Sequence, residues 1–300
     1  MATLSGYRRP DGSLGARNHI LILPSVVCAG QTATLIGEAG AVAVVHQHGC
    51  GQVGEDEAHT ERAFIGFATN PNVGACLVVS LGCETIQGAR LADRIRQRGQ
   101  RVEFAGIQLL GGTFNTVESG RAAVAELQGR LAELPRSGGG LEDLRVGIET
   151  SALTQSRAMA LANFLTGAGI AWVVAQPEEG PAGAGERIRY GERAKTPAAV
   201  VEHAGEGAEQ HVGLAGAGAQ VIVSLRAGWQ APLGNAVAPV IAVAGDPELH
   251  AALADDFDAG PEASPEQLLE QVIGAFNGEP TAAERRGARD FVVRRVARTM

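Results

Sequence analysis

The chain of 300 residues is poor in lysine, aromatic residues and cysteine. Lys195 is its only lysine, so arginine carries nearly all of the positive charge, and the formal net charge is −8. The sequence has no run rich in lysine and arginine, and therefore lacks the basic surface that nucleic acids require. We expect no nucleic-acid partner.

Long apolar runs are also missing. The longest, such as residues 20–29, are shorter than the roughly 20 residues that span a bilayer, and residues 1–10 contain no hydrophobic signal core. Four cysteines are too few for a disulfide framework in a chain of this length. These features favour a cytoplasmic protein with reduced thiols and no membrane partner.

The sequence does contain enough apolar residues for a large core, at 45%. Short apolar runs bounded by turn residues alternate with helical patterns, which is typical of parallel sheets. In the first half we expect strands near 19–27, 41–46, 74–81 and 102–108, and helices near 31–39, 56–69, 84–99 and 115–134. In the second half we expect strands at 144–149, 171–175, 220–224 and 240–243, and helices at 156–166, 265–276 and 281–298, with a helical seed at 198–203.

The fold class that follows is α/β, with two Rossmann-like domains that have mainly parallel sheets and flanking helices. Three consecutive glycines at 138–140 favour neither regular element, so we interpret this stretch as a linker. The predicted domains are residues 1–136 and residues 143–300, and the second is expected to end in a pair of helices.

Cysteine, histidine and glutamate stand where three of the expected strands end. Ligands of parallel α/β sheets bind beyond the carboxyl ends of the strands, so we predict that these side chains form one site. Exposed cysteines at strand ends are reactive, whereas Cys76, in the middle of a strand, is expected to be a buried small apolar residue. The predicted site residues are Cys28, His46, His48, Cys50, Cys83 and Glu84.

Six motifs follow one another in the first 115 residues: 6–18, 23–28, 46–52, 70–73, 81–84 and 108–113. Together they resemble the altronate/galactarate dehydratase family, and residues 226–239 and 255–258 are similar to its C-terminal part. The resemblance implies the removal of water from a sugar acid to give a 2-keto-3-deoxy acid, with a divalent metal that is commonly iron. The family includes a sulfolactate sulfo-lyase branch. Where we expect its Cys-Gly-Gly-Ser-Asp stretch, this chain has Glu149-Thr-Ser-Ala.

Dehydration of a hydroxy acid requires a base, a cation that stabilises the enediolate and an acid that helps hydroxide to leave. We assign His48 as the proton shuttle, with His46 and Glu84 as further catalytic candidates. For the metal we favour a mononuclear Fe²⁺ or Mn²⁺ on His46, Cys50 or Glu84. The alternative is an iron–sulfur cluster with an open iron, held by Cys28, Cys50 and Cys83.

Six residues are candidates for binding the substrate: Arg17, Asn18, Gln52, Gly111, Gly112 and Thr113. The Gly-Gly-Thr turn before a helix can present backbone N–H groups to a carboxylate, but it can equally be a plain turn with Thr113 as the N-cap. Arg17 is either a carboxylate ligand or a surface arginine. The remaining histidines are expected to face solvent: His59, His203, His211 and His250.

The leading hypothesis is a metal-dependent hydro-lyase that acts on a small hydroxy acid such as altronate or galactarate. It is expected to form a homo-oligomer, and the resemblance adds a possible small partner subunit. The alternatives are a non-catalytic or substrate-binding subunit of such an enzyme, a related lyase acting on a sulfolactate-like acid, and a hydrolase-like or redox enzyme with Cys50 as the nucleophile.

Overall fold

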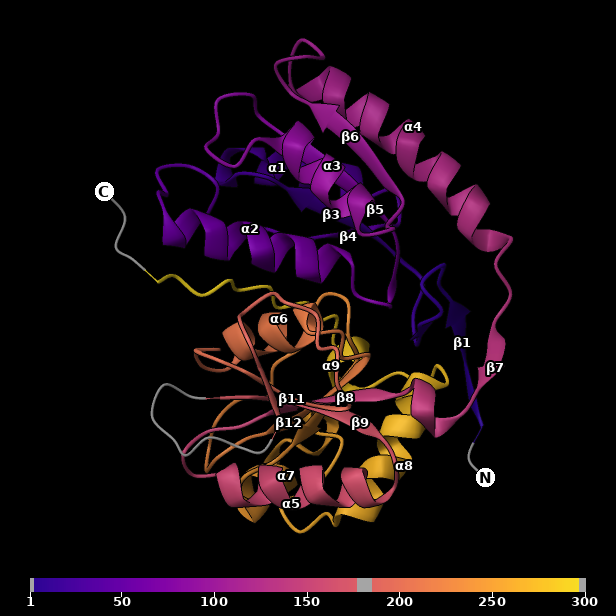
Figure 1. Cartoon of the computed structure of the whole chain (residues 1–300), viewed down its shortest axis with the longest axis vertical. Coiled ribbons are helices and arrows are strands. Elements are labelled where there is room, and N and C mark those ends of the chain that lie inside the picture. The colour runs from indigo at the N-terminus through magenta and orange to yellow at the C-terminus, as the bar shows by residue number, and fades with distance from the viewer. Residues whose placement is uncertain (1–2, 177–184, 297–300) are drawn as a thin grey trace.

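The computed structural model describes residues 3–176 and 185–296, and its two parallel sheets lie one above the other in Figure 1. The first sheet has four strands in the order β4-β3-β5-β6. Its strands are β3 (His19–Pro24), β4 (Val42–Ala43), β5 (Val73–Ser80) and β6 (Val102–Gly106), and the helices that flank it are α1 (Gly30–Gly37), α2 (Glu55–Ala68), α3 (Gly88–Gln97) and α4 (Thr113–Ala132).

The second sheet has six parallel strands in the order β10-β11-β9-β8-β12-β13. Its strands are β8 (Arg145–Glu149), β9 (Ala171–Ala175), β10 (Glu186–Ile188), β11 (Ala198–Val201), β12 (Val221–Leu225) and β13 (Val240–Val243). The helices of this half are α5 (Gln155–Gly167), α6 (Ala208–Gly216), α7 (Pro247–Ala252), α8 (Pro265–Phe276) and α9 (Ala282–Arg285). The expected fold class, α/β with mainly parallel sheets and flanking helices, is confirmed.

A small antiparallel sheet runs beside the two parallel ones. It consists of β1 (Leu4–Arg8), β2 (Leu14–Gly15) and β7 (Ser137–Gly139), and short 3-10 turns occur at η1 (Val27–Ala29), η2 (Leu141–Asp143) and η3 (Ala254–Asp256). The interpretation of 138–140 as a stretch without regular structure was therefore wrong. A Cβ atom on Gly139 would lie 2.5 Å from the Asp143 carboxylate, so glycine lets this strand pack closely.

Two further expectations in the second half were wrong. The helical seed at 198–203 is strand β11, whose Ala-Ala-Val-Val run pairs with β9 in the middle of the sheet. Of the last helix, expected over 281–298, the described residues up to 296 contain only the four residues of α9, and residues 297 and 298 lie outside the described part of the chain. Helix α9 ends because Gly287 takes a positive φ of 71°, the conformation with which glycine closes helices. Beyond it the described chain has no regular secondary structure up to residue 296.

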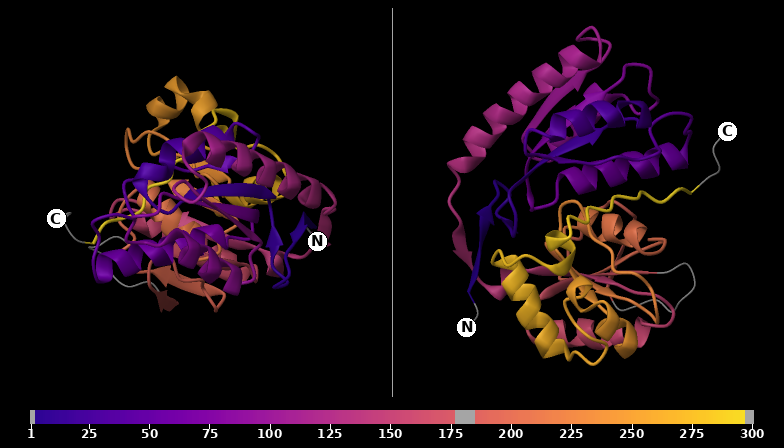
Figure 2. Two further views of the ribbon diagram at one scale, coloured as in Figure 1. Left: turned by 90° about the horizontal axis from the view of Figure 1, so that it is seen from above. Right: turned by 180° about the vertical axis from the view of Figure 1, so that it is seen from behind.

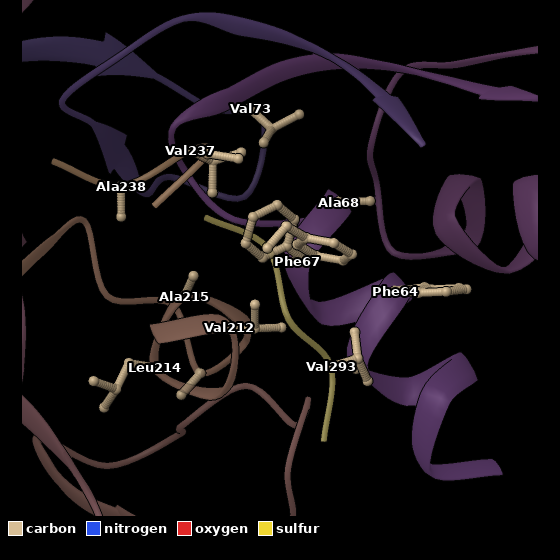
Figure 3. Close-up of a cluster of buried hydrophobic side chains, with 14 of the residues drawn as sticks. Phe64, Phe67, Ala68, Val73, Val212, Leu214, Ala215, Val237, Ala238 and Val293 are labelled. Carbon is tan, nitrogen blue, oxygen red and sulfur yellow. The ribbon is translucent and has the colours of Figure 1, made fainter. Parts of the chain in front are cut away.

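The two halves meet where α2 packs against α6, with the segment 291–296 running between these helices (Figures 1 and 2). One cluster of buried apolar side chains joins both halves, including Phe67 of α2, Val212 of α6 and Val293 (Figure 3). A Cβ on Gly66 would lie 2.3 Å from the carbonyl oxygen of Gly191, so backbones touch at this interface. The predicted division between residues 136 and 143 stays a prediction.

None of the helices in the described part of the chain is both long enough and apolar enough to cross a bilayer.

Candidate functional site

Cys28 and Cys83 lie at the position where a parallel α/β sheet usually binds its ligand. The chain runs from β3 to β4 on one side of the first sheet, and from β5 to β6 on the other. The neighbouring strands β3 and β5 therefore form the point at which the strand order reverses, and ligands bind beyond their carboxyl ends. Cys28 follows β3 and Cys83 follows β5.

Backbone hydrogen bonds tie the loop of Cys50 to the loops of the other two cysteines. Val27 N–H donates to the carbonyl oxygen of His48 at 2.9 Å, and Thr85 N–H donates to that of Gly49 at 2.9 Å. Gly49 has a φ of 94°, and a Cβ there would lie 2.1 Å from the carbonyl oxygen of Ser25. Only glycine fits at this crossing. All three cysteines are free and exposed, while Cys76 is buried as expected.

His46 lies under this loop with both ring nitrogens occupied. Its Nε2–H donates to the carbonyl oxygen of Pro24 at 2.7 Å, and its Nδ1 accepts the backbone N–H of His48 at 3.2 Å. The ring also packs on Phe64, with centroids 4.6 Å apart. Burial lowers the pKa of His46 to about 4, so the ring is neutral at pH 7. In this arrangement no nitrogen of His46 is left for a metal or a proton.

His48 differs from His46 because one of its nitrogens has no partner. Nε2–H donates to the carbonyl oxygen of Val293 at 2.9 Å, which leaves Nδ1 as the unprotonated nitrogen. This Nδ1 is buried and meets no hydrogen-bonding group in the described chain. Burial, as the largest effect, lowers the pKa of His48. The side chain is therefore a neutral imidazole with a lone pair available.

The Glu84 carboxylate caps the start of α3 and is buried. Oε1 accepts the hydroxyl of Ser25 at 3.0 Å and the backbone N–H of Gly88 at 3.3 Å, and Oε2 accepts the N–H of Gly82. A carboxylate near the first turn of a helix is stabilised by the helix dipole. Glu84 thus fixes the loop that carries Cys83, and its oxygens already have protein donors.

Gln52 is also buried, and its amide holds the Cys50 loop in place. Oε1 accepts the N–H of Gly49 at 2.9 Å, and Nε2 donates to Asp56 Oδ2 and to Thr60 Oγ1, both at 2.8 Å. Asp56 in turn accepts the N–H of Val296 at 3.1 Å. The network connects the loop to helix α2 and to the C-terminal segment.

Arg17 and Asn18 lie away from the other candidates, because residues that precede β3 stand at the opposite edge of a parallel sheet. Arg17 pairs with Glu284 at 2.8 Å and donates to the carbonyl oxygen of Ala275 at 2.7 Å. Asn18 accepts from Arg9 at 2.8 Å. The protein itself occupies both side chains.

Gly111, Gly112 and Thr113 lie next to the Cys83 loop, since Gln108 N–H donates to the carbonyl oxygen of Leu81 at 3.1 Å. Gly112 N–H is already bonded to the carbonyl oxygen of Ile107 at 2.8 Å. The N-cap of α4 is Gly112, and Thr113 is the first helical residue, so the interpretation of Thr113 as the N-cap was wrong. Gly112 has a φ of 121°, a conformation that threonine cannot adopt without strain.

Within residues 3–176 and 185–296, no three His, Cys, Asp or Glu side chains gather closely enough to hold a metal ion. The donor atoms nevertheless differ in availability. His46 and Glu84 are engaged by protein partners, whereas the three thiols are free and exposed on adjoining loops.

The second sheet has a site of its own that the sequence reasoning missed. Glu149 is the last residue of β8, and Ser224 and Arg226 lie at the end of β12. Strands β8 and β12 are neighbours in the sheet, and the strand order reverses between them. The buried Glu149 carboxylate accepts hydrogen bonds from Ser224 Oγ and Arg226 Nη1, and from His211 Nε2 at 2.9 Å. The strand-end pattern that led to Cys83 would also have led to Glu149.

Two histidines expected to face solvent are buried instead. His211 is fully enclosed between Glu149 and the carbonyl oxygen of Gly234, which Nδ1 contacts at 3.0 Å. His59 stacks on Tyr190 with ring centroids 4.6 Å apart. Both lie on the helices α2 and α6, whose faces the interface between the two halves covers.

Glu149 is ionised despite its burial. Desolvation alone would raise its pKa, but the charge and hydrogen bond of His211, followed by the charge of Arg226 and the Ser224 hydroxyl, lower it. His211 then has a carbonyl oxygen on one side and a carboxylate on the other. Both of its nitrogens therefore face acceptor oxygens.

Comparison with known proteins shows that the segments carrying these two strand edges match two domains of one protein family. The model of the D-galactarate dehydratase/altronate hydrolase second domain matches residues 6–132, and that of the D-galactarate/altronate dehydratase C-terminal domain matches residues 180–299. The chain belongs to the D-galactarate/altronate dehydratase family. The first segment carries Cys28, Cys50 and Cys83, and the second carries His211 and Arg226. Glu149 lies between the segments that match the family.

Three relatives match about half of the chain. Altronate dehydratase of Bacillus subtilis (strain 168) is 29% identical over 160 residues, which are 49% of this chain and 32% of that protein. Altronate dehydratase of Escherichia coli (strain K12) is 31% identical over 156 residues, 48% of this chain and 31% of the relative. The (2R)-sulfolactate sulfo-lyase subunit beta of Chromohalobacter salexigens is 34% identical over 136 residues, 45% of this chain and 34% of the relative. The chain thus spans about a third of the length of these family members.

Proposed function

We propose that this chain is the metal-dependent catalytic part of a hydro-lyase that dehydrates a sugar acid, such as altronate or galactarate, to a 2-keto-3-deoxy acid. Its membership of a dehydratase family supports lyase chemistry. The observation that carries the proposal is the meeting of three thiol-bearing loops beyond β3 and β5, joined by the hydrogen bonds of His48 and Gly49. Exposed cysteines on adjoining loops at such an edge favour a reactive centre over a structural one.

The donor atoms favour the thiols as the metal ligands. Cys28, Cys50 and Cys83 are free and exposed, and an exposed side chain can change its χ1 rotamer more readily than a buried one. Thiolates suit iron, either as a single divalent ion or in a cluster with one open iron. When bound there, iron or manganese would supply a Lewis acid for the substrate's carboxylate and hydroxyl groups. His46 and Glu84 would act on this centre only by holding the loops.

His48 is the proposed base. Its Nδ1 carries no proton and has no donor among the described residues, whereas both nitrogens of His46 are engaged. The low pKa keeps the ring neutral, so that it can take the proton beside the substrate's carboxylate. The hydrogen bond from Nε2–H to Val293 leaves Nδ1 as the nitrogen that can accept a proton.

Partners are proposed from the same relatives. The match to a protein named as a beta subunit favours a small partner subunit. Val45, Val53, Leu109 and Phe114 are exposed apolar side chains on the loops of the first-sheet edge or next to them. Such side chains favour assembly, and we propose a homo-oligomer.

The test is a lyase assay on anaerobically purified protein, alone and with a small partner subunit, with added Fe²⁺ or Mn²⁺. Altronate, galactarate and related hydroxy acids are supplied, and the 2-keto acid is measured together with bound metal. Cys28→Ser, Cys50→Ser and Cys83→Ser should each lose iron and activity, while Cys76→Ala, a buried control, should keep both. If the triple variant still binds iron and forms product, the thiol site is wrong.

A second candidate is a carbon–sulfur lyase acting on a sulfonated hydroxy acid. It is favoured by the 34% identity to the sulfo-lyase subunit. Sulfolactate is therefore included in the panel and sulfite is measured. Sulfite release without any 2-keto acid from the sugar acids would replace the first proposal. If the protein binds sugar acids but converts none of them, it is a substrate-binding subunit.

A further inference from the structure

A second cleft, of about 810 Å³, opens beyond the carboxyl ends of β8 and β12. Its volume is within the range of small-molecule sites, and its place at the reversal of strand order is where α/β sheets bind ligands. Arg226, Glu149 and the loops 150–152 and 205–207 line it. None of the predicted site residues lines this cleft.

The walls of the cleft are fixed by internal hydrogen bonds. Gln210 accepts the N–H of Thr150 at 3.0 Å and donates to the carbonyl oxygens of Thr150 and Gly205, at 2.8 and 2.9 Å. Thr154 Oγ1 accepts the N–H of Ser151 at 2.9 Å. A ligand would therefore meet a preformed surface, which reduces the entropy lost on binding.

Glu149 holds Arg226 and His211 together beneath the cleft. Its carboxylate accepts hydrogen bonds from the Arg226 guanidinium and from His211 Nε2, the latter at 2.9 Å. A buried charge is costly unless it is paired and hydrogen-bonded, and Glu149 supplies this pairing for Arg226.

Arg226 also has donor capacity that the protein does not use. Its side chain lines the cleft and the residue is only 8% exposed, yet its Nε–H has no hydrogen-bond partner among the described residues. Nη1 alone is bonded to Glu149 Oε1. A guanidinium has five N–H donors in a planar fork that matches a carboxylate, so the arginine is held by Glu149 and can bind a second anion.

The other polar residues of the cleft suit the remaining groups of a sugar acid. Glu206, Glu209 and Gln230 line the cleft, and their side-chain oxygens can accept hydrogen bonds from hydroxyl groups. Arg294 and Arg295 also line it, and their charges offset the repulsion between the glutamates and a second carboxylate. The cleft thus combines arginines with hydrogen-bond acceptors, as a polyhydroxy acid requires.

We propose that this second cleft is a binding site for a small polyhydroxy carboxylate, whose carboxylate group accepts hydrogen bonds from Arg226. The choice of a sugar acid over another anion rests on the proposed function, whereas anion binding on Arg226 does not. Glu149, His211 and Ser224 are positioning residues that hold the guanidinium. Arg294 and Arg295 line the same cleft and follow Val293, which binds His48, so the cleft adjoins the first-sheet edge.

The test measures binding without turnover. The full chain is freed of metal by a chelator and titrated in a calorimeter with galactarate, with the neutral galactitol and with inorganic sulfate. We expect galactarate to bind, and galactitol and sulfate to bind at least ten-fold more weakly. Equal binding of galactitol would overturn the role of the carboxylate, and equal binding of sulfate would overturn the assignment to a sugar acid.

Two substitutions test whether galactarate binds in this cleft, and a third controls for effects on folding. Arg226→Lys keeps the charge beside Glu149 but loses the fork, and should weaken galactarate binding at least ten-fold. Because a change in the buried cluster can impair folding, Ala152→Trp provides a second test, since it fills the cleft from an exposed position. Its matched control is Leu153→Trp, an exposed neighbour that does not line the cleft. Unchanged affinity in both Arg226→Lys and Ala152→Trp would overturn the site.

The Cys28→Ser/Cys50→Ser/Cys83→Ser triple variant distinguishes this proposal from the proposed function. It should bind galactarate as the wild type does in chelator. If no substrate is ever converted but binding still depends on Arg226, the proposed function fails and the cleft stands. If binding is lost with the thiols while Arg226→Lys is unaffected, the cleft is not the binding site.

Discussion

His48 Nε2–H donates to the carbonyl oxygen of Val293 at 2.9 Å, so the C-terminal segment is bonded directly to the cysteine-bearing edge of the first sheet. Val296 N–H reinforces this link by donating to Asp56 at 3.1 Å. Between these two bonds lie Arg294 and Arg295, which line the second cleft. Four consecutive residues thus connect the strand edges of the two sheets.

The first prediction concerns the anchoring of this segment. Phe291 is buried against Phe67, with ring centroids 4.6 Å apart, and lies 6.1 Å from the His46 ring. Phe291→Ala should lower the free energy of unfolding by about 3–4 kcal/mol, because it leaves a cavity between the two halves. Val292→Ala is the matched control, since Val292 is 45% exposed and its change should cost about 0.5 kcal/mol or less. Equal urea midpoints for the two variants would contradict the anchoring.

The second prediction concerns the crossing of the cysteine loops. Gly49→Ala places a Cβ against the carbonyl oxygen of Ser25, and it forces alanine to adopt the positive φ that glycine has there. We expect the free energy of unfolding to fall by about 3 kcal/mol or more. Gly51 also has a positive φ, 68°, but has open space around it. Gly51→Ala should therefore cost only about 1 kcal/mol. Urea unfolding of both variants measures the difference, and similar losses would show that the loops do not cross as described.

The elements of the fold could be predicted where local pattern and tertiary packing agree. Strands β9 and β13 and helix α8 fall where the sequence predicted them. The two strands are short continuous apolar runs, which favour buried strands, and the apolar residues of α8 recur at helical spacing. Residues 198–201 combine alanine, a helix former, with valine, a strand former, and only their place between β9 and β10 decides. We expected the C-terminal segment to be helical. In the structure, residues 291–293 are buried, exposed and buried in turn, which is the period of an extended chain.

The candidate site was predictable only in outline. Parallel strands bring their carboxyl ends to one edge, which is enough to place the loops of Cys28, Cys50 and Cys83 together. Which donor atoms remain available depends on distant partners, such as Val293 for His48 and Ser25 for Glu84. Glu149 stands at the end of a strand, as the pattern of Cys83 would have indicated, but its partners could not be predicted for the same reason. Its hydrogen bonds join residues 62 and 75 positions apart, and no local pattern reveals them.

The third prediction concerns Gln52, which we had expected to bind substrate. Its amide donates to Asp56 at 2.8 Å in a buried network. Gln52→Glu would set two carboxylates against each other, and should lower the free energy of unfolding by about 3–5 kcal/mol. Gln128→Glu adds the same charge on the exposed face of α4 and should cost about 1 kcal/mol or less. A stable Gln52→Glu variant with weakened substrate binding would restore the original interpretation.

The last prediction is a loss of stability in mild acid, caused by buried histidines. Burial lowers the pKa of His19, His46 and His59 to about 4, whereas a histidine in the unfolded chain titrates near 6.5. Above pH 6.5 these rings are neutral in both states, and their contribution to stability is fully present. As the pH falls below 6.5, these histidines become protonated in the unfolded chain but stay neutral in the folded protein. The free energy of unfolding therefore falls until the pH reaches about 4.

Between pH 7 and pH 5 we therefore expect the free energy of unfolding to drop by about 1–2 kcal/mol for each such histidine. This range avoids the titration of carboxylates such as Glu149, whose lowered pKa matters only in stronger acid. His46→Gln should be less stable than the wild type at pH 7 but should show a shallower dependence on pH. His203→Asn, at an exposed position whose positive φ of 51° asparagine tolerates, should keep the wild-type slope. Urea titrations at pH 7, 6 and 5 measure these slopes, and an unchanged slope in His46→Gln would mean that this ring is accessible to protons in the folded protein.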